Sequence, residues 1–195
     1  MSTAISDPIA AAVATVAAPG ESNGIVHGLS TAEFEILSAK CLDARKAAYC
    51  PYSLFRVGAS ILLHPSSSTN PSPSSSPKII TGANVENASY PVGTCAERVA
   101  MGTAVMQGHR IGSFKAIGVA TDMEAFCSPC GMCRQFLREF CELEIPIFMF
   151  NKRGEYKVMT LGELLPMSFG PDVLPPREVL KRERDEEEEG KGKIA

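Results

Sequence analysis

The sequence predicts an α/β fold of three layers, α/β/α, in which helices cover both faces of a mixed five-stranded sheet. Three observations support this. The chain has 195 residues and an apolar fraction of 45%, which suffices for one well-filled domain core. Apolar residues recur at helical spacing in some segments and form short continuous runs in others. The segments follow the order helix, strand, strand, helix, strand, helix, strand, strand, which indicates a mixed sheet.

The first predicted helix begins at Ser30, because Ser30 and Glu33 have the spacing of a capping box. Apolar residues then recur at helical spacing to about Ala48, and Pro51 ends the segment. The other predicted elements are strands at 55–63, 78–83, 114–120, 145–150 and 155–159 and helices at 95–106 and 129–140. The strand at 114–120 has the continuous apolar run of a buried, parallel position.

We expect the folded domain to span residues 30–174. Residues 1–29 are rich in Ala, Ser, Pro and Gly and predict a poorly ordered leader. Residues 64–78 are mostly Ser, Pro, Thr and Asn, and they predict a loop insert between two strands. Since long surface loops cost little additional closure entropy, deleting residues 66–76 should leave the fold intact. Residues 175–195 form a tail with charges of both signs, which we expect to be solvated.

Charge and cysteine content exclude several classes of protein. The formal net charge is −3 and the central region has no basic cluster, so we expect no nucleic-acid partner. The apolar stretch at residues 9–18 is too short to cross a bilayer, and no Lys or Arg precedes it, so we expect neither a membrane span nor a signal peptide. The seven cysteines are odd in number, and three have metal-ligand spacing, which favours a reducing compartment such as the cytoplasm.

The most informative motif is Cys95-Ala96-Glu97, followed by a second segment with Cys130 and Cys133. Three thiolates leave one coordination position open, as in catalytic zinc sites, and Glu97 is then the natural proton carrier. Both cysteine segments are predicted to begin helices, whose N-termini favour thiolates. Arg98 follows Glu97 directly, and its guanidinium could donate to the thiolate sulfurs without binding the metal.

Cys127 leaves an alternative open. It forms a second Cys-x-x-Cys unit with Cys130, so it could close the site as a fourth ligand of a structural zinc module. The familiar ferredoxin pattern of an iron–sulfur site requires a cysteine four residues after Cys133, but that position is Leu137. Neither alternative explains Glu97 beside a ligand. The enzyme hypothesis predicts that Cys127 is dispensable for metal binding, whereas the structural hypothesis predicts that it is required.

Cys-Ala-Glu at 95–97 and Pro-Cys-Gly-Met-Cys-Arg-Gln at 129–135 resemble the zinc-dependent cytidine deaminase family. Residues 48–59 and 82–90 are similar to the substrate-binding half of that family, and the resemblance covers about residues 32–174. It implies a cytidine deaminase-like fold and hydrolytic deamination of cytidine and 2′-deoxycytidine to uridine and 2′-deoxyuridine, with release of ammonia, in pyrimidine salvage. In this mechanism zinc-activated water attacks C4 and Glu97 shuttles the proton.

The resemblance also implies roles for single residues. Asn84 and Glu86 would hold the ribose hydroxyls, Phe55 would pack near the pyrimidine, Ala96 would contact the substrate, and Phe169 would reach the base in a neighbouring subunit. Local chemistry alone leaves two other interpretations open. Asn84 and Glu86 are also what a polar strand end beside a turn requires, and an aromatic such as Phe55 in a strand needs no ligand.

The first of the three expected ligands, Cys95, is Cys rather than His, which in this family points to the branch that acts on free nucleosides. That branch implies one zinc ion per subunit and a homotetramer whose active sites are completed by neighbouring subunits. Another aminopyrimidine nucleoside is the nearest alternative substrate, because the zinc half of the site would look the same. Asn84 and Glu86 indicate in either case that the substrate has a sugar.

Overall fold

The computed structural model describes residues 25–65 and 77–192. Five strands form one sheet in the order β4-β3-β5-β6-β7. Their bounds are Val57–Leu63 for β3, Ile79–Ala83 for β4, Phe114–Thr121 for β5, Pro146–Phe150 for β6 and Tyr156–Thr160 for β7. Strands β5 and β6 are parallel, and the other three neighbouring pairs are antiparallel. The parallel pair arises because a helical crossover joins β5 to β6, whereas hairpins join β3 to β4 and β6 to β7. The predicted mixed five-stranded sheet is confirmed.

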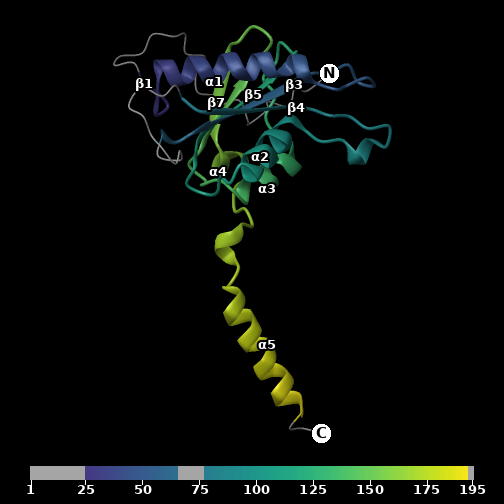
Figure 1. Ribbon diagram of the computed structural model, residues 1–195, viewed down its shortest axis with the longest axis vertical. Helices are drawn as coiled ribbons and strands as arrows, with labels where there is room; N and C mark the ends of the chain where they lie inside the picture. Colours follow the sequence, from purple (N-terminus) through teal and green to yellow (C-terminus); the bar gives the residue numbers. More distant parts are fainter. Residues whose placement is uncertain (1–24, 66–76, 193–195) are drawn as a thin grey trace, which may run out of the picture.

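Helices cover both faces of the sheet, as three layers require (Figure 1). Helix α1, Thr31–Ala44, packs on one face, where its buried residues meet Phe148 and Phe150. Helices α2, Ala96–Met106, and α3, Gly131–Arg138, lie on the other. The capping box at the start of α1 is formed, because Glu33 N–H donates to the Ser30 hydroxyl at 3.4 Å and the Glu33 carboxylate accepts from Ser30 N–H at 2.9 Å.

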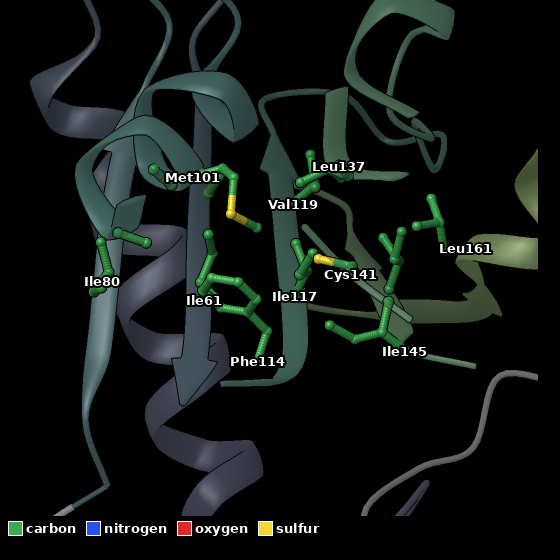
Figure 2. Close-up of a cluster of buried hydrophobic side chains, with 14 of the residues drawn as sticks. Ile61, Ile80, Met101, Phe114, Ile117, Val119, Leu137, Cys141, Ile145 and Leu161 are labelled. Atoms are coloured by element: carbon green, nitrogen blue, oxygen red, sulfur yellow. The ribbon is translucent and has the colours of Figure 1, made fainter. Parts of the chain in front are cut away.

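The larger apolar core lies between the sheet and helices α2 and α3 (Figure 2). Ile61 of β3 stands opposite Ile80 of β4 and Ile117 of β5, and Met101 of α2 packs in the same cluster. Adjacent strand residues point to opposite faces. Leu62 accordingly belongs to the second core cluster, under α1.

Helix α2 approaches β4 closely because Gly82 has no side chain. A Cβ at Gly82 would lie 2.5 Å from both the Ala96 carbonyl oxygen and the Ala100 nitrogen, which no real Cβ tolerates. The contact involves the first turn of α2, which is the turn that follows Cys95. Gly82 therefore determines how closely the first turn of α2, and with it the Cys-Ala-Glu motif, packs against the sheet.

Several elements differ from the sequence prediction. Helix α1 ends at Ala44 rather than at about 48, and a 3-10 turn, η2, Arg45–Ala47, follows it. A small hairpin of β1, Ile25–Val26, and β2, Leu29–Ser30, occupies the end of the predicted leader, because Leu29 is buried with the α1 core cluster. The remainder of that leader and residues 66–76 of the predicted insert lie outside the described residues.

Four further short or terminal elements were not predicted. Helix α4, Leu161–Leu164, begins at a capping box formed by Thr160 and Glu163. The chain also forms two 3-10 turns, η4, Tyr90–Val92, which precedes α2, and η5, Pro171–Val173, which precedes α5. Helix α5, Arg177–Gly192, runs away from the domain through the charged segment (Figure 1). In the described part of the chain, no helix combines the length and apolarity that a membrane span requires.

Candidate functional site

The N-termini of α2 and α3 bring three thiols together. Cys95 is the N-cap of α2, Cys130 is the N-cap of α3, and Cys133 lies in the first turn of α3. Their three sulfur atoms all lie within 4.8 Å of one another, and Cys95 Sγ is 3.8 Å from Cys130 Sγ. The structure therefore brings together the three cysteines that the sequence proposes as metal ligands.

This thiol group fits a tetrahedral zinc ion. Zinc–thiolate bonds of about 2.3 Å at tetrahedral angles place two sulfurs about 3.8 Å apart. The Cys95–Cys130 separation has this value. Two helix N-termini also point at the group, and their partial positive charge favours the anionic sulfurs that a divalent metal needs.

The three thiols differ in how readily they lose their protons. The pKa of Cys95 falls to about 5, chiefly because the Cys133 thiol donates to its sulfur, with further help from Cys130 and Arg98. The pKa of Cys133 is raised, because Cys133 is the donor to Cys95 and is also buried beside Glu97. A thiolate thus forms first at Cys95, and a bound cation would supply the charge needed to ionise the others.

Glu97 is a buried carboxyl group directly beside the thiols. It is 3% exposed, and its Oε2 atom has no hydrogen-bond partner among the described residues. Burial is the main reason why its pKa is raised, and the negative charge of Cys95 raises it further. An unpaired buried carboxyl oxygen is costly, so such a group is usually reserved for a ligand, a water molecule or a proton.

Glu97 and two of the thiols line a hollow with a volume of about 350 Å³, within the ~300–1,000 Å³ that small-molecule sites occupy. The predicted residues that line it are Phe55, Asn84, Glu86, Cys95, Glu97 and Cys130. It is further lined by Val57, Val85, Tyr90, Gly93, Thr94, Val119, Thr121, Cys127 and Ser128. The hollow therefore has a metal-binding end and a polar end, with apolar walls between them.

At the polar end, the amide of Asn84 fastens the strand ends together. Its Nδ2 donates to the Phe55 carbonyl at 2.9 Å, and its Oδ1 accepts from Val57 N–H at 2.8 Å. These two bonds hold Phe55 against the hollow. They leave one N–H and one lone pair of the amide for another partner.

The carboxylate of Glu86 is held by the turn that precedes Phe55. Its Oε2 accepts from Tyr52 N–H at 3.0 Å and from Ser53 N–H at 3.2 Å, and its Oε1 accepts from the Ser53 hydroxyl. The Ser53 hydroxyl bond is the largest cause of the lowered pKa of Glu86. Glu86 is accordingly ionised and oriented at neutral pH.

Two predicted substrate residues do not line this hollow. Ala96 is fully buried in the core cluster under α2. Phe169 is 61% exposed, and its carbonyl accepts a hydrogen bond from Gln135 of α3 at 2.9 Å. The structure thus does not bring either side chain into the hollow of its own chain.

Arg98 and Cys127 lie around the thiol group without belonging to it. Arg98 donates to the Gly93 carbonyl at 3.2 Å, and its guanidinium helps to lower the pKa of Cys95. The Cys127 thiol donates to the thioether sulfur of Met123 at 3.4 Å. Cys127 lines the hollow, but its sulfur is not among the three clustered ligand atoms. All seven cysteines lie in the described ranges, and each is a free thiol.

Sequence reasoning missed Thr121 and Val119 as lining residues, and it gave Ser53 no role of its own, although Ser53 lies in the segment 48–59 that resembles the substrate-binding half. Thr121 ends β5 and Val119 lies two residues before it, so period-two alternation along this strand could have placed both on the face of the hollow. The contact of Ser53 with Glu86 was not predictable from local pattern, because it joins residues 33 positions apart.

Comparison with known proteins gives consistent results. Residues 32–149 match the family model described as the cytidine and deoxycytidylate deaminase zinc-binding region. The chain is 39% identical over 142 residues to a cytidine deaminase of Sporosarcina psychrophila, covering 73% of this chain and 95% of the relative. It is 42% identical over 154 residues to a probable cytidine deaminase of Dictyostelium discoideum, covering 76% of this chain and 92% of the relative.

The fold is also similar to solved structures. The crystal structure of cytidine deaminase from Burkholderia pseudomallei superposes with a TM-score of 0.61 at 36% sequence identity. The match covers 69% of this chain and 98% of that chain. The described domain thus spans nearly the full length of this neighbour.

Proposed function

The chain belongs to the cytidine and deoxycytidylate deaminase family, and from this premise we propose that it deaminates cytidine and 2′-deoxycytidine hydrolytically. Water and the nucleoside give uridine or 2′-deoxyuridine and ammonia, a reaction of pyrimidine salvage. The observation that supports this most is the position of Glu97, whose unpaired buried oxygen shares one hollow with the thiol group and with Asn84 and Glu86.

Cys95, Cys130 and Cys133 are the residues that would hold zinc, one ion per subunit, as the matched zinc-binding region and the clustering of their sulfurs support. Bound zinc supplies a Lewis acid that makes water a nucleophile near neutral pH. Arg98 would moderate the negative charge of three thiolates, since its guanidinium already favours the ionised form of Cys95.

Glu97 carries the protons. Burial raises its pKa above the ordinary carboxyl value, which makes it a better acceptor of the water proton than an exposed carboxylate. It passes the first proton to N3 of the pyrimidine while the water oxygen bonds to C4. It then takes the remaining proton from the new C4 hydroxyl and delivers it to the exocyclic amine, so that the C4–N bond breaks as the C4 carbonyl forms, and ammonia leaves. Burial of Glu97 excludes bulk water from these transfers.

Asn84 and Glu86 bind the sugar, and Phe55 packs beside the base. All three line the same hollow as Glu97, and the fixed amide and carboxylate offer hydrogen-bonding groups where a ribose would lie. Another aminopyrimidine nucleoside would use the same groups. Comparing turnover of cytidine with that of cytosine tests the sugar contacts, since equal kcat/KM would contradict their assignment.

We assign the chain to a homotetramer in the cytoplasm, with active sites completed by neighbouring subunits. Phe169 supports this, because it is exposed on a segment fastened to α3 and does not enter its own hollow. The seven free thiols support a reducing compartment.

The decisive experiment uses purified, zinc-analysed protein with cytidine and follows uridine and ammonia. Glu97→Ala should keep its zinc, because Glu97 is not among the clustered ligand atoms, and should lose activity by about a thousandfold, as expected when the proposed proton carrier is removed. Glu35→Ala, which removes an exposed carboxylate on α1, is the control and should remain active. Activity retained in Glu97→Ala would remove Glu97 from the mechanism. A zinc-replete but inactive wild type would contradict the proposed reaction.

A further inference from the structure

The hydroxyl of Ser53 contacts two residues that line the hollow, although Ser53 itself does not line it. We propose that Ser53 is a positioning residue, whose hydroxyl orients the Glu86 carboxylate toward the sugar and links it to the placement of Phe55. This inference rests on the proposed nucleoside deaminase function. It adds a residue that acts through Glu86 and not by touching the substrate.

The Ser53 oxygen both donates and accepts. Its hydroxyl proton goes to Oε1 of Glu86, and the same oxygen accepts from Phe55 N–H at 3.0 Å. The chain is thereby joined through one atom from the carboxylate at the polar end of the hollow to the aromatic residue on its wall.

The Ser53 hydroxyl decides how Glu86 presents its second oxygen. Backbone N–H groups of Tyr52 and Ser53 occupy Oε2, so both lone pairs of that atom are taken. Oε1 accepts only the Ser53 hydroxyl among the described residues, which leaves it one lone pair for a substrate hydroxyl. Without the Ser53 hydroxyl, the carboxylate would be anchored through Oε2 alone. It could then reorient and expose Oε1 to solvent, because Glu86 is partly exposed.

The turn around Ser53 shows that the chain is bent to make this contact. Leu54 has a φ of 57°, in the left-handed region, which is energetically unfavourable for any residue other than glycine. Its side chain is 77% exposed. The bend returns the backbone so that Phe55 N–H reaches the Ser53 oxygen, two residues back, in the pattern of a serine turn. Leu54 N–H is satisfied by the Cys50 carbonyl at 3.0 Å.

A neighbouring hollow of about 230 Å³ explains why Ser53 acts indirectly. It is lined by Tyr52, Ser53, Glu86, Asn87, Tyr90 and Gly93. Glu86, Tyr90 and Gly93 line both hollows, so they form the wall between them. Ser53 thus contacts Glu86 while lining only the neighbouring hollow, and not the hollow that Glu97 lines.

The test is a double-mutant cycle of Ser53→Ala and Glu86→Gln, with kcat and KM for cytidine measured on zinc-analysed protein. Ser53→Ala alone should raise KM about tenfold, the effect of one hydrogen bond to a charged group, while kcat stays within about twofold. In the Glu86→Gln background the same substitution should raise KM by less than about twofold, because its target is changed. Ser53→Thr keeps the hydroxyl and should stay close to wild type.

Ser38→Ala serves as the matched control, since it also removes a serine hydroxyl. Ser38 lies in helix α1, and no residue of α1 lines either hollow. Should Ser53→Ala not fold, Ser53→Cys replaces the hydroxyl with a weak donor of similar shape and takes its place in the cycle. An unchanged KM in the single variant, or an undiminished effect in the Glu86→Gln background, would overturn the positioning role. A wild type that binds zinc but turns over no cytidine would instead refute the proposed function, and this inference with it.

Discussion

Two of the clustered cysteines occupy helix N-cap positions that usually hold Ser, Thr, Asp or Asn. Neither Cys95 nor Cys130 makes a side-chain capping bond to its helix. Replacing a good N-cap residue typically costs about 1 kcal/mol of stability. The chain therefore places thiols where capping groups would stabilise the helices more, which is consistent with their being kept for a ligand.

The behaviour of Cys127 separates an enzyme from a structural zinc module. Cys127→Ser should retain zinc at the wild-type ratio, because its thiol is directed to Met123 and lies outside the three-sulfur group. Cys130→Ser should lose most of its zinc during dialysis against a chelator, since a hydroxyl replaces a thiolate in a three-ligand site. Metal analysis of both variants checks this. Equal zinc loss would support the structural module.

The contact between α2 and β4 shows how elements position the site. Gly82→Ala should destabilise the domain by about 1–3 kcal/mol, because the added Cβ would lie 2.5 Å from backbone atoms of α2. It should also weaken zinc binding, because α2 must move and Cys95 moves with it. Denaturant unfolding and chelator competition measure the two effects.

Gly102→Ala, on the same helix, is the control. A Cβ there meets nothing within 4 Å, so the substitution should stabilise the protein by about 0.5–1 kcal/mol through helix propensity. If the two variants had equal stability, the close approach of α2 to β4 would not be what sets its position.

The ion pair between α1 and β5 gives the fold a pH dependence. Lys115 Nζ lies 2.7 Å from the Glu33 carboxylate, and both side chains are largely buried. Burial acts to raise the pKa of Glu33, but the bonds from Lys115 and Ser30 outweigh it, so the pKa is lowered from 4.5. A lowered pKa in the folded state contributes stability above the unfolded value and loses it as the pH falls through the folded value.

We therefore expect the free energy of unfolding to fall below about pH 4.5, and Glu33→Gln to remove part of that dependence. At pH 7 this variant should be destabilised by about 1–2 kcal/mol, because Lys115 keeps its charge without its partner. Asp43→Asn, which breaks an exposed pair with Lys46, should change stability little. Urea unfolding from pH 3.5 to 7 compares the three, and parallel curves for wild type and Glu33→Gln would contradict the assignment.

Elements whose signals are local were predictable, and those that depend on tertiary contacts were not. The five strands and the helices α2 and α3 agree with periodicity to within a few residues, and the capping box placed the start of α1 correctly. Hairpin β1–β2 was missed because it is held by burial of Leu29 under Phe148, far along the chain. In the site, the thiol spacing was visible in the sequence, whereas the Ser53 contact depends on a left-handed Leu54 that no pattern indicates.

At the scale of the whole molecule, several large apolar side chains are exposed on the single chain, and the proposed homotetramer would cover some of them. Met167, Phe169, Tyr90, Val92 and Met132 are all more than 60% exposed. Arg138, buried in α3, donates to the Ser168 hydroxyl at 3.0 Å and pairs with Asp172, so the Phe169 segment is fixed from both sides. A fixed, exposed aromatic residue is typical of an interface anchor.

If the proposed homotetramer is correct, Phe169→Ala should lower kcat/KM for cytidine by about tenfold or more, because the proposal places this ring in a neighbouring subunit's site. Zinc content and the monomer's fold should not change, since Phe169 is not part of either core cluster. Leu174→Ala, another exposed apolar residue, is the control. Light scattering reports the subunit number. An active monomer, unaffected by Phe169→Ala, would refute both the assembly and the role.

The β3–β4 hairpin has its two ends in different surroundings. At one end, Val57 pairs with Thr121, and both line the hollow. At the other end, the Leu63 N–H is bonded to the Lys78 carbonyl at 3.0 Å, which closes the ladder before the Ser- and Pro-rich stretch begins. Six residue steps of a strand separate these ends by about 20 Å. Protein engineers could use this distance, because an affinity tag or a fluorescent reporter inserted between Leu63 and Lys78 would be attached at the end of the hairpin that is far from the hollow. Evolution could likewise lengthen the loop between Leu63 and Lys78 at little cost, since the hydrogen bond between these two residues closes the ladder independently of the loop.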